Sequence, residues 1–180
     1  MPYPVALSDD VTLRVVTAHD LESIRDAYRR NREHLAPWEP ERAESFYNST
    51  EQGQILANQI AQLGAGTGYP LVMVQGSTVV GRMTLSGIVR GPFQSANVGY
   101  WVDKEHAGAG LASAALGHVI AHSRDELGLH SIQAGTLLHN AGSQRVLRKA
   151  GFEPIGVARN YLKIAGRWQD HLLFQRILSE

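Results

Sequence analysis

The chain has 180 residues, 43% of them hydrophobic, and its 17 basic and 17 acidic side chains balance to a formal net charge of zero. A domain of this length buries roughly 70% of its unfolded surface, so we expect a single domain over residues 1–180. The balanced charge argues against nucleic acid or a membrane surface as a partner, and the absence of cysteine excludes disulfides and thiolate nucleophiles.

The first predicted elements are one strand and two helices. Residues 11–16 alternate as a strand, and Thr17 with Asp20 forms a pair that is typical of a helix start. Apolar residues then recur at helical spacing. Ser49 with Gln52 is expected to cap a second helix, which ends in a glycine-rich run.

Between these two helices, Pro37 and Pro40 enclose Trp38 and Glu39, and residues 34–40 are expected to be irregular. Proline fixes its own φ angle and cannot donate a backbone hydrogen bond, so it breaks helices. Ordered irregular segments often form a wall of a binding site, which makes Trp38 and Glu39 candidate substrate-binding residues. An apolar plug over the core is the alternative role for Trp38.

The rest of the chain combines strands with two further helices. Strands are expected at residues 69–74, 78–85, 96–102, 131–138, 152–161 and 168–177, and helices at residues 111–127 and 141–149. Tight turns between the first three of these strands predict an antiparallel meander. The complete order is β-α-α-β-β-β-α-β-α-β-β, which indicates a mixed α/β fold.

The most informative segment runs from Val98 to Ser113, where a strand breaks into a glycine-containing loop that opens an alanine-rich helix. Gly108 and Gly110 have no Cβ, so backbone N–H groups there can face outward beside the positive end of the helix. A pyrophosphate suits such a cradle, although a plain strand-to-helix turn would use the same glycines. Ser113 replaces the third glycine of a dinucleotide fingerprint and leucine follows Gly110, which disfavours Rossmann and P-loop sites.

Several motifs in a fixed order accompany this loop. They are Tyr100-Trp101-Val102, Gly108-x-Gly110-Leu-Ala112, Asn140-x-x-Ser143, Lys149-Ala-Gly-Phe152, Tyr161-Leu162 and Gly166-x-Trp168-x-Asp170-His171, together with Leu35-x-Pro-Trp-Glu-Pro40. In this combination the chain resembles the GCN5-related N-acetyltransferases (GNAT), and within them the ribosomal-protein N-terminal acetyltransferase branch of the RimJ/RimL type. The resemblance covers nearly all of the chain.

The resemblance implies an acyl-CoA N-acyltransferase fold with a mixed sheet, and acetyl-CoA as the acetyl donor. The pyrophosphate would lie on the backbone amides of the loop, and the pantetheine arm would pair with the strand that ends at Trp101 and Val102. Asn140 would bond the arm near the thioester while it caps its helix. The expected cofactor-binding residues are therefore Trp101, Val102, Ala107, Gly108, Ala109, Gly110, Leu111, Ala112, Asn140 and Lys149, the last at the nucleotide end.

The chain departs from the family pattern at positions that affect catalysis. Ala107 stands where the loop usually starts with Gln or Arg, so binding would depend on backbone N–H groups, helped by Lys104 or His106. Leu147 stands where many members have a tyrosine that protonates the leaving thiolate. Ser143 is then the expected acid or thiolate stabiliser. A local backbone partner in the helix is its alternative role.

The acceptor amine must be neutral to attack the thioester directly. An α-amine with a pKa of about 7.8 is roughly a tenth neutral near pH 7, whereas lysine is neutral in well under ~0.1% of molecules. The preferred acceptor is therefore the N-terminus of a protein, and the resemblance implies a ribosomal protein. We expect Glu39 to act as the base; Glu41, Glu44 and His34 are alternatives, and Leu162 replaces the glutamate of the branch.

Other readings stay open. The enzyme would instead acetylate a small amine such as an aminoglycoside, polyamine or amino acid, or the chain would be a non-catalytic acetyl-CoA-binding module. His118 and His122 have a metal-compatible spacing but no third ligand, so no metal is expected, and Asp170 is expected to be a structural hydrogen-bonding residue. Without a secretion signal or an apolar span, the protein is expected to be cytoplasmic; a homodimer is left open.

Overall fold

The computed structural model describes residues 3–179. Its strands are β1 (Val5–Ala6), β2 (Val11–Val15), β3 (Gly68–Gln75), β4 (Thr78–Val89), β5 (Ser95–Val102), β6 (Ser131–Leu137), β7 (Glu153–Ile164) and β8 (Arg167–Ile177). Its α-helices are α1 (Leu21–Arg30), α2 (Arg32–Leu35), α3 (Ser49–Gly64), α4 (Leu111–Asp125) and α5 (Ala141–Lys149). Short 3-10 turns cover Ala18–Asp20, Glu44–Tyr47 and Lys104–His106.

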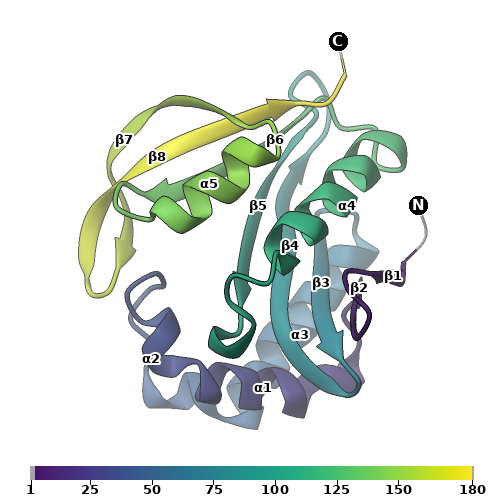
Figure 1. Cartoon of the computed structure of the whole chain (residues 1–180), viewed down its shortest axis with the longest axis vertical. Helices are drawn as coiled ribbons and strands as arrows, with labels where there is room; N and C mark the ends of the chain where they lie inside the picture. The colour runs from purple at the N-terminus through teal and green to yellow at the C-terminus, as the bar shows by residue number, and fades with distance from the viewer. Residues whose placement is uncertain (1–2, 180) are drawn as a thin grey trace.

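The eight described strands form one sheet in the order β1-β2-β3-β4-β5-β6-β8-β7. All neighbours are antiparallel except β5 and β6, which run parallel and pair only from Ser95 opposite Ser131 to Asn97 opposite Gln133. Beyond these pairs the two strands separate, and the sheet opens between a β1–β5 part and a β6–β8 part (Figure 1). The opening leaves one edge of β5 without a strand partner from Val98 onward.

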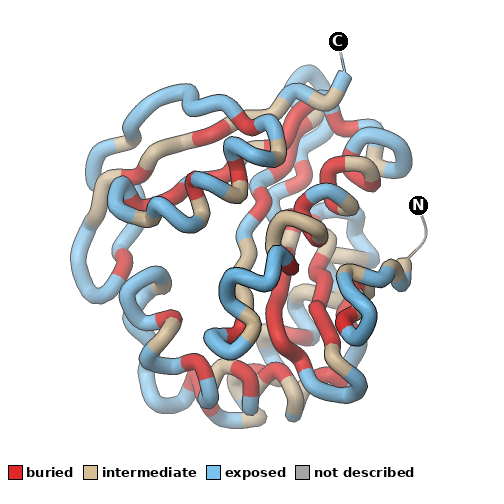
Figure 2. Tube along the Cα trace, in the orientation of Figure 1, coloured by how far each residue is buried: buried red, intermediate tan, exposed pale blue. Residues whose placement is uncertain are grey.

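Helices cover the β1–β5 part of the sheet on both faces. Successive strand residues point to opposite sides, and the apolar residues on each side are buried against helices. Leu71 and Met73 of β3 belong to the larger core cluster, which also contains residues of α4 and α5. Val72, between them, packs with Ile24 of α1 and Leu56 of α3 in a second cluster. Figure 2 shows the buried residues concentrated along β3 and β4 and on the inner side of α4. This packing fixes the β5 edge and the start of α4 in place.

The structure confirms the predicted mixed α/β fold and its antiparallel meander, with two additions. Strand β1, which has two residues, is too short to show periodicity, and α2 continues helical structure to Leu35, within the segment expected to be irregular from residue 34. The predicted cap of α3 was wrong by one residue. Asn48 is the N-cap and accepts from the Glu51 backbone N–H, whereas Ser49 turns its hydroxyl to Glu22.

Within residues 3–179, no helix is both long and apolar enough to cross a membrane.

Candidate active site

A cavity of about 840 Å³ occupies the opening between β5 and β6. It is lined by residues 98–102 of β5, 106–108 and 110–113 around the start of α4, 134–137 of β6, 139–143, 145–147 and 149 around α5, and by His34, Leu35, Trp38, Glu39 and His171. This volume is typical of a small-molecule site. Segments from nearly the whole length of the chain thus meet around one cavity.

The glycine loop, residues 107–110, joins the short turn after β5 to α4. Gly108 and Gly110 both have a φ of +82°, the left-handed region that side chains rarely adopt, and a Cβ at either would meet no described atom within 4 Å. Gly110 is the N-cap of α4, so the first backbone N–H groups of this helix, starting at Leu111, have no partner within it. The loop therefore presents open backbone and a helix dipole to the cavity, an arrangement suited to an anion.

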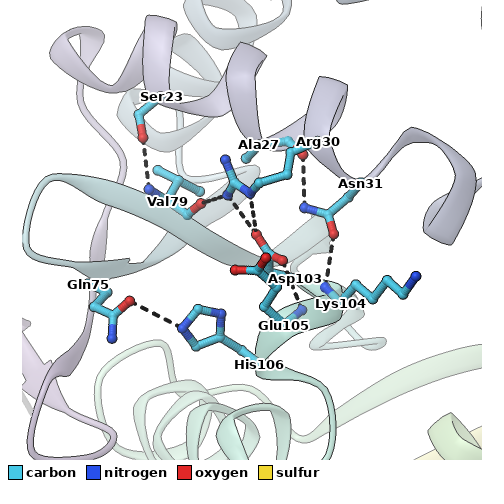
Figure 3. Close-up of polar contacts among 10 residues, drawn as sticks. All are labelled: Ser23, Ala27, Arg30, Asn31, Gln75, Val79, Asp103, Lys104, Glu105 and His106. Carbon is cyan, nitrogen blue, oxygen red and sulfur yellow. Dashed lines mark hydrogen bonds and ion pairs between the residues drawn. The ribbon is translucent and has the colours of Figure 1, made fainter.

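The stem of this loop is tied to α1 by the carboxylate of Asp103, which is 1% exposed (Figure 3). It accepts a hydrogen bond from Arg30 Nε at 2.8 Å and one from the Glu105 backbone N–H at 3.1 Å. Burial by itself would raise the pKa of Asp103, but hydrogen bonds from Asn31, Arg30 and Glu105 outweigh it and hold this pKa below its ordinary value. Asp103 is therefore an ionised anchor.

Two further contacts hold the stem (Figure 3). The Asn31 side chain donates to the Ala27 carbonyl at 2.9 Å and accepts from the Lys104 backbone N–H at 2.9 Å, which joins α1 directly to the turn. His106 Nε2 lies 3.3 Å from the Gln75 Oε1 at the end of β3. The loop thus starts from a rigid base, so its amides are oriented before any ligand arrives.

Helix α5 faces the loop across the cavity, and Asn140 precedes it as the N-cap. The Asn140 side-chain oxygen accepts from the Ser143 backbone N–H at 3.1 Å, as expected of an N-cap, which leaves the amide NH₂ for other partners. The Ser143 hydroxyl lies 2.9 Å from the Tyr100 hydroxyl. Leu147, one turn later, is 0% exposed and belongs to the core, so this position contributes packing to the site and no acid.

Trp38 and Glu39 lie at the part of the cavity lined by α2 and the loop after β6. The Trp38 ring packs against His139 with centroids 5.5 Å apart, and the Glu39 carbonyl accepts from Ala165 N at the tip of the β7–β8 hairpin. Burial raises the pKa of Glu39, while the positive charges of Arg42 and Arg82 lower it in part. A carboxyl group with a raised pKa beside a cavity is suited to proton transfer.

Nearly all residues expected in the site lie along this cavity. Ala109 and Lys104 are the exceptions, since neither residue is part of the lining. The Trp101 indole packs against Tyr28 of α1 at 5.1 Å and donates to its hydroxyl, so toward the opening Trp101 offers mainly backbone. Among the alternative bases, His34 lines the cavity whereas Glu41 and Glu44 do not.

Several polar side chains in the lining have no site role predicted from the sequence, among them Tyr100, Thr136, His139, Arg145 and His171. His171 is 4% exposed, and its Nδ1 donates to the Gln169 carbonyl at 3.0 Å, which leaves Nε2 as the acceptor in the neutral ring. Strand alternation could have found it, because Asp170 faces away and bonds the Asn160 backbone N–H. The structural role expected of Asp170 is thereby confirmed.

His122 is buried in the core, where its ring packs against Tyr3 and Tyr69. Over residues 3–179 no group of three or more His, Cys, Asp or Glu side chains is arranged to hold a metal ion.

Known proteins that resemble this chain in sequence and fold are acetyltransferases. A family model described as an acetyltransferase (GNAT) domain matches residues 10–153. The chain is 33% identical over 168 residues to the ribosomal protein uS5 alanine N-acetyltransferase of Escherichia coli (strain K12). The aligned region covers 92% of this chain and 87% of that protein.

Two solved structures are similar to it in fold and sequence. The ribosomal-protein-S5-alanine acetyltransferase of Vibrio fischeri superposes with a TM-score of 0.94 at 30% identity, over 99% of this chain and 98% of the other. RimJ of Mycobacterium smegmatis, in complex with CoA-disulfide, superposes with a TM-score of 0.88 at 31% identity, over 93% and 81% of the respective chains.

Proposed function

From the premise that this chain belongs to the GNAT acetyltransferase family and is an acetyl-CoA-dependent N-acetyltransferase, we propose that its acceptor is the N-terminal α-amine of a protein. The relatives from Escherichia coli and Vibrio fischeri are named as alanine acetyltransferases of a ribosomal protein. A ribosomal protein whose chain starts with alanine is therefore the acceptor we propose, and the cytoplasm is the proposed place of action.

The glycine loop and the free edge of β5 suit the donor. Acetyl-CoA supplies the activated acetyl group when it is bound. The open space at Gly108 and Gly110 and the free N–H groups at the start of α4 fit a pyrophosphate, and β5 from Val98 onward offers unpaired backbone to an extended arm. Lys149 lines this cavity and also a smaller one beside Arg124 and Arg176, which suits the phosphorylated nucleoside end.

The cavity wall around Glu39 suits an amine that is already partly neutral. Because burial raises the pKa of Glu39, its carboxylate is a somewhat stronger base than an exposed glutamate. An α-amine needs only such modest help, whereas a lysine side chain would have to be deprotonated from a pKa of about 10.4. Glu39 would take the amine proton directly or through one water molecule.

In this proposal the reaction needs no covalent intermediate on the protein. Holding the two reactants in one cavity supplies much of the rate by positioning. The amine nitrogen attacks the acetyl carbonyl carbon, the carbon–sulfur bond breaks, and the electron pair goes to sulfur. Ser143 at the start of α5 donates to that sulfur, while Asn140 orients the arm.

The observation that supports the proposal most is that one cavity contacts the glycine loop, Ser143 and Glu39 together. The test measures release of free thiol from acetyl-CoA by the purified protein. The acceptor panel contains peptides with a free N-terminal alanine or serine, lysine peptides with a blocked N-terminus, and small amines (an aminoglycoside, a polyamine and an amino acid). We expect the fastest release with the N-terminal alanine peptides.

Two other results would contradict the proposal. Fast release with a small amine and none with peptides would identify a small-amine acetyltransferase. Binding of acetyl-CoA without thiol release for any amine would identify a non-catalytic binding module. Calorimetry with acetyl-CoA, run on the same preparation, separates the second result from a protein that has lost its cofactor site.

A further inference from the structure

A second hydroxyl group lies beside Ser143. The Tyr100 hydroxyl is 2.9 Å from Ser143 Oγ and 3.4 Å from the Ser143 carbonyl oxygen, and both residues line the main cavity. The two residues are 43 positions apart, and one comes from β5 and the other from α5. The hydroxyl pair, Tyr100 with Ser143, thus spans the opening between the two parts of the sheet.

The local structure holds both members of the hydroxyl pair in place. Tyr100 belongs to the part of β5 that pairs only with β4, where it lies opposite Met83. Ser143 is fixed in the first turn of α5, because its backbone N–H is capped by Asn140. One turn further along α5 stands Leu147, which is fully buried and has no hydroxyl group. The phenol at this site is therefore the one that Tyr100 of β5 supplies.

The surroundings keep the Tyr100 hydroxyl protonated. Burial raises its pKa above the ordinary tyrosine value, and the hydrogen bond with Ser143 lowers it only in part. A protonated phenol donates hydrogen bonds readily. A serine hydroxyl that accepts from a phenol becomes a better donor itself, because hydrogen bonds in a chain polarise one another.

Building on the proposed function, we propose that Tyr100 is a positioning residue that acts through Ser143: it orients the serine hydroxyl and replaces the proton that this hydroxyl gives to the leaving thiolate. As the carbon–sulfur bond breaks, the Ser143 proton moves to sulfur and the Tyr100 proton moves to Ser143 Oγ. Tyr100 then regains a proton from solvent. Glu39 takes the proton that the amine loses and releases it to solvent, so the protons balance over one turnover.

The alternative is that the hydroxyl pair only fastens α5 to β5. A fastening role predicts loss of stability and of acetyl-CoA affinity in Tyr100→Phe, because the cofactor site lies between these elements. The proton-supply role predicts a loss in kcat with the affinity unchanged. It further predicts that the loss depends on Ser143.

The experiment measures kcat with an N-terminal alanine peptide, the acetyl-CoA Kd by calorimetry, and the melting temperature. The variants are Tyr100→Phe, Ser143→Ala and the double variant. We expect kcat of Tyr100→Phe to fall about 10- to 100-fold with the Kd within about twofold of wild type, since proton donation contributes on this scale. The double variant should be no slower than Ser143→Ala, because both residues act on one proton. Tyr69→Phe, in β3 outside the cavity lining, is the matched control and should keep its kcat.

Three results would overturn the inference: an unchanged kcat in Tyr100→Phe, a weakened Kd that accounts for the whole effect, or the same fold-loss in the Ser143→Ala background. Should Tyr100→Phe not fold, the Ser143→Ala variant decides. An unchanged kcat in Ser143→Ala would overturn the inference, because Tyr100 acts through this hydroxyl. A lowered kcat at unchanged Kd would support the inference. Wild-type protein that acetylates no amine would instead refute the proposed function.

Discussion

The glycine loop and the segment around Trp38 and Glu39 face the same cavity but are built in different ways. The loop offers backbone N–H groups and two glycines at positive φ, and none of residues 107–110 is charged. The segment offers side chains: the Trp38 indole packs on His139, and the partly buried Glu39 carboxyl lies near Arg42.

This difference shows what each part of the site requires. Backbone recognition depends on the conformation of a few consecutive residues, so the loop can bind an anion although Ala107 offers no polar side chain. Side-chain chemistry depends on which distant segments the fold brings together and on the burial that they create. Substitutions should therefore affect the loop through geometry and the segment through charge.

The largest effect is expected for Gly110→Val. Valine strongly disfavours a φ of +82°, and its side chain would occupy the open space where phosphate oxygens approach the loop. We expect the acetyl-CoA Kd to rise about 10- to 100-fold, where each tenfold step corresponds to ~1.4 kcal/mol. Isothermal titration calorimetry measures this directly.

Gly128→Val is the matched control. Gly128 follows the other end of α4 with a φ of +59°, has open space at its Cβ, and lies outside the cavity lining. This variant should lose stability through the same backbone strain and keep the wild-type Kd. Equal Kd values for Gly110→Val and wild type would refute the phosphate cradle.

A smaller effect, about tenfold in kcat/KM near neutral pH, is expected for Glu39→Gln, because the α-amine is already partly neutral without a base. In wild type, activity should fall as the pH drops through the raised pKa of Glu39, because the protonated carboxyl is no base. The Gln variant should lack this step. The rates of the two proteins should converge at high pH, where the amine is fully neutral.

Glu39→Gln should also raise the melting temperature slightly at neutral pH. A raised pKa means that ionising Glu39 disfavours the folded state, so this cost is absent at low pH and appears as the pH rises. Glu41→Gln, two residues along and outside the lining, is the control and should change neither quantity. A pH profile shared by Glu39→Gln and wild type would eliminate Glu39 as the base.

The smallest effect on activity is expected for Asp103→Asn, which loosens the stem of the loop. Since Arg30 is 36% exposed, breaking this pair should cost about 1–2 kcal/mol of unfolding free energy, less than a fully buried pair. The acetyl-CoA Kd should rise only about threefold, because the loop keeps its glycines.

The lowered pKa of Asp103 gives its ion pair a defined pH dependence. The stabilisation is present above the pKa of unfolded Asp and is lost as the pH falls through the lower folded value, so the two unfolding curves should approach each other in acid. Urea unfolding measures the stability of both variants. Asp125→Asn is the control: it removes the exposed ion pair with Arg124 and should leave the midpoint of urea unfolding unchanged. An Asp103→Asn midpoint equal to wild type would show that the anchor is dispensable.

The same division explains which features could be predicted from the sequence. The strands around the meander, the start of α4 and the Asn140 cap follow from local patterns of apolar residues, glycine and capping side chains, and the structure contains all of them. The cap of α3 was missed because Asn48 and Ser49 are adjacent and both suit the role.

Contacts between distant segments could not be predicted in this way. Nothing local to Tyr100 indicates that its hydroxyl reaches Ser143, and the turn at Ala165 gives no sign that it bonds the Glu39 carbonyl. The burial that raises the pKa of Glu39 likewise exists only once α2, β6 and the hairpin have come together. Side-chain chemistry at the site therefore had to come from the structure.

The most direct test of the central claim is to locate the acetyl group on a peptide that offers both kinds of amine. The peptide begins with a free alanine and carries an internal lysine, and tandem mass spectrometry after incubation with acetyl-CoA assigns the modified nitrogen. We predict acetylation at the N-terminal α-amine with the lysine unmodified, and no product with Gly110→Val at low acetyl-CoA. Acetylation of the lysine side chain, or of neither amine while a small amine is acetylated, would contradict the account.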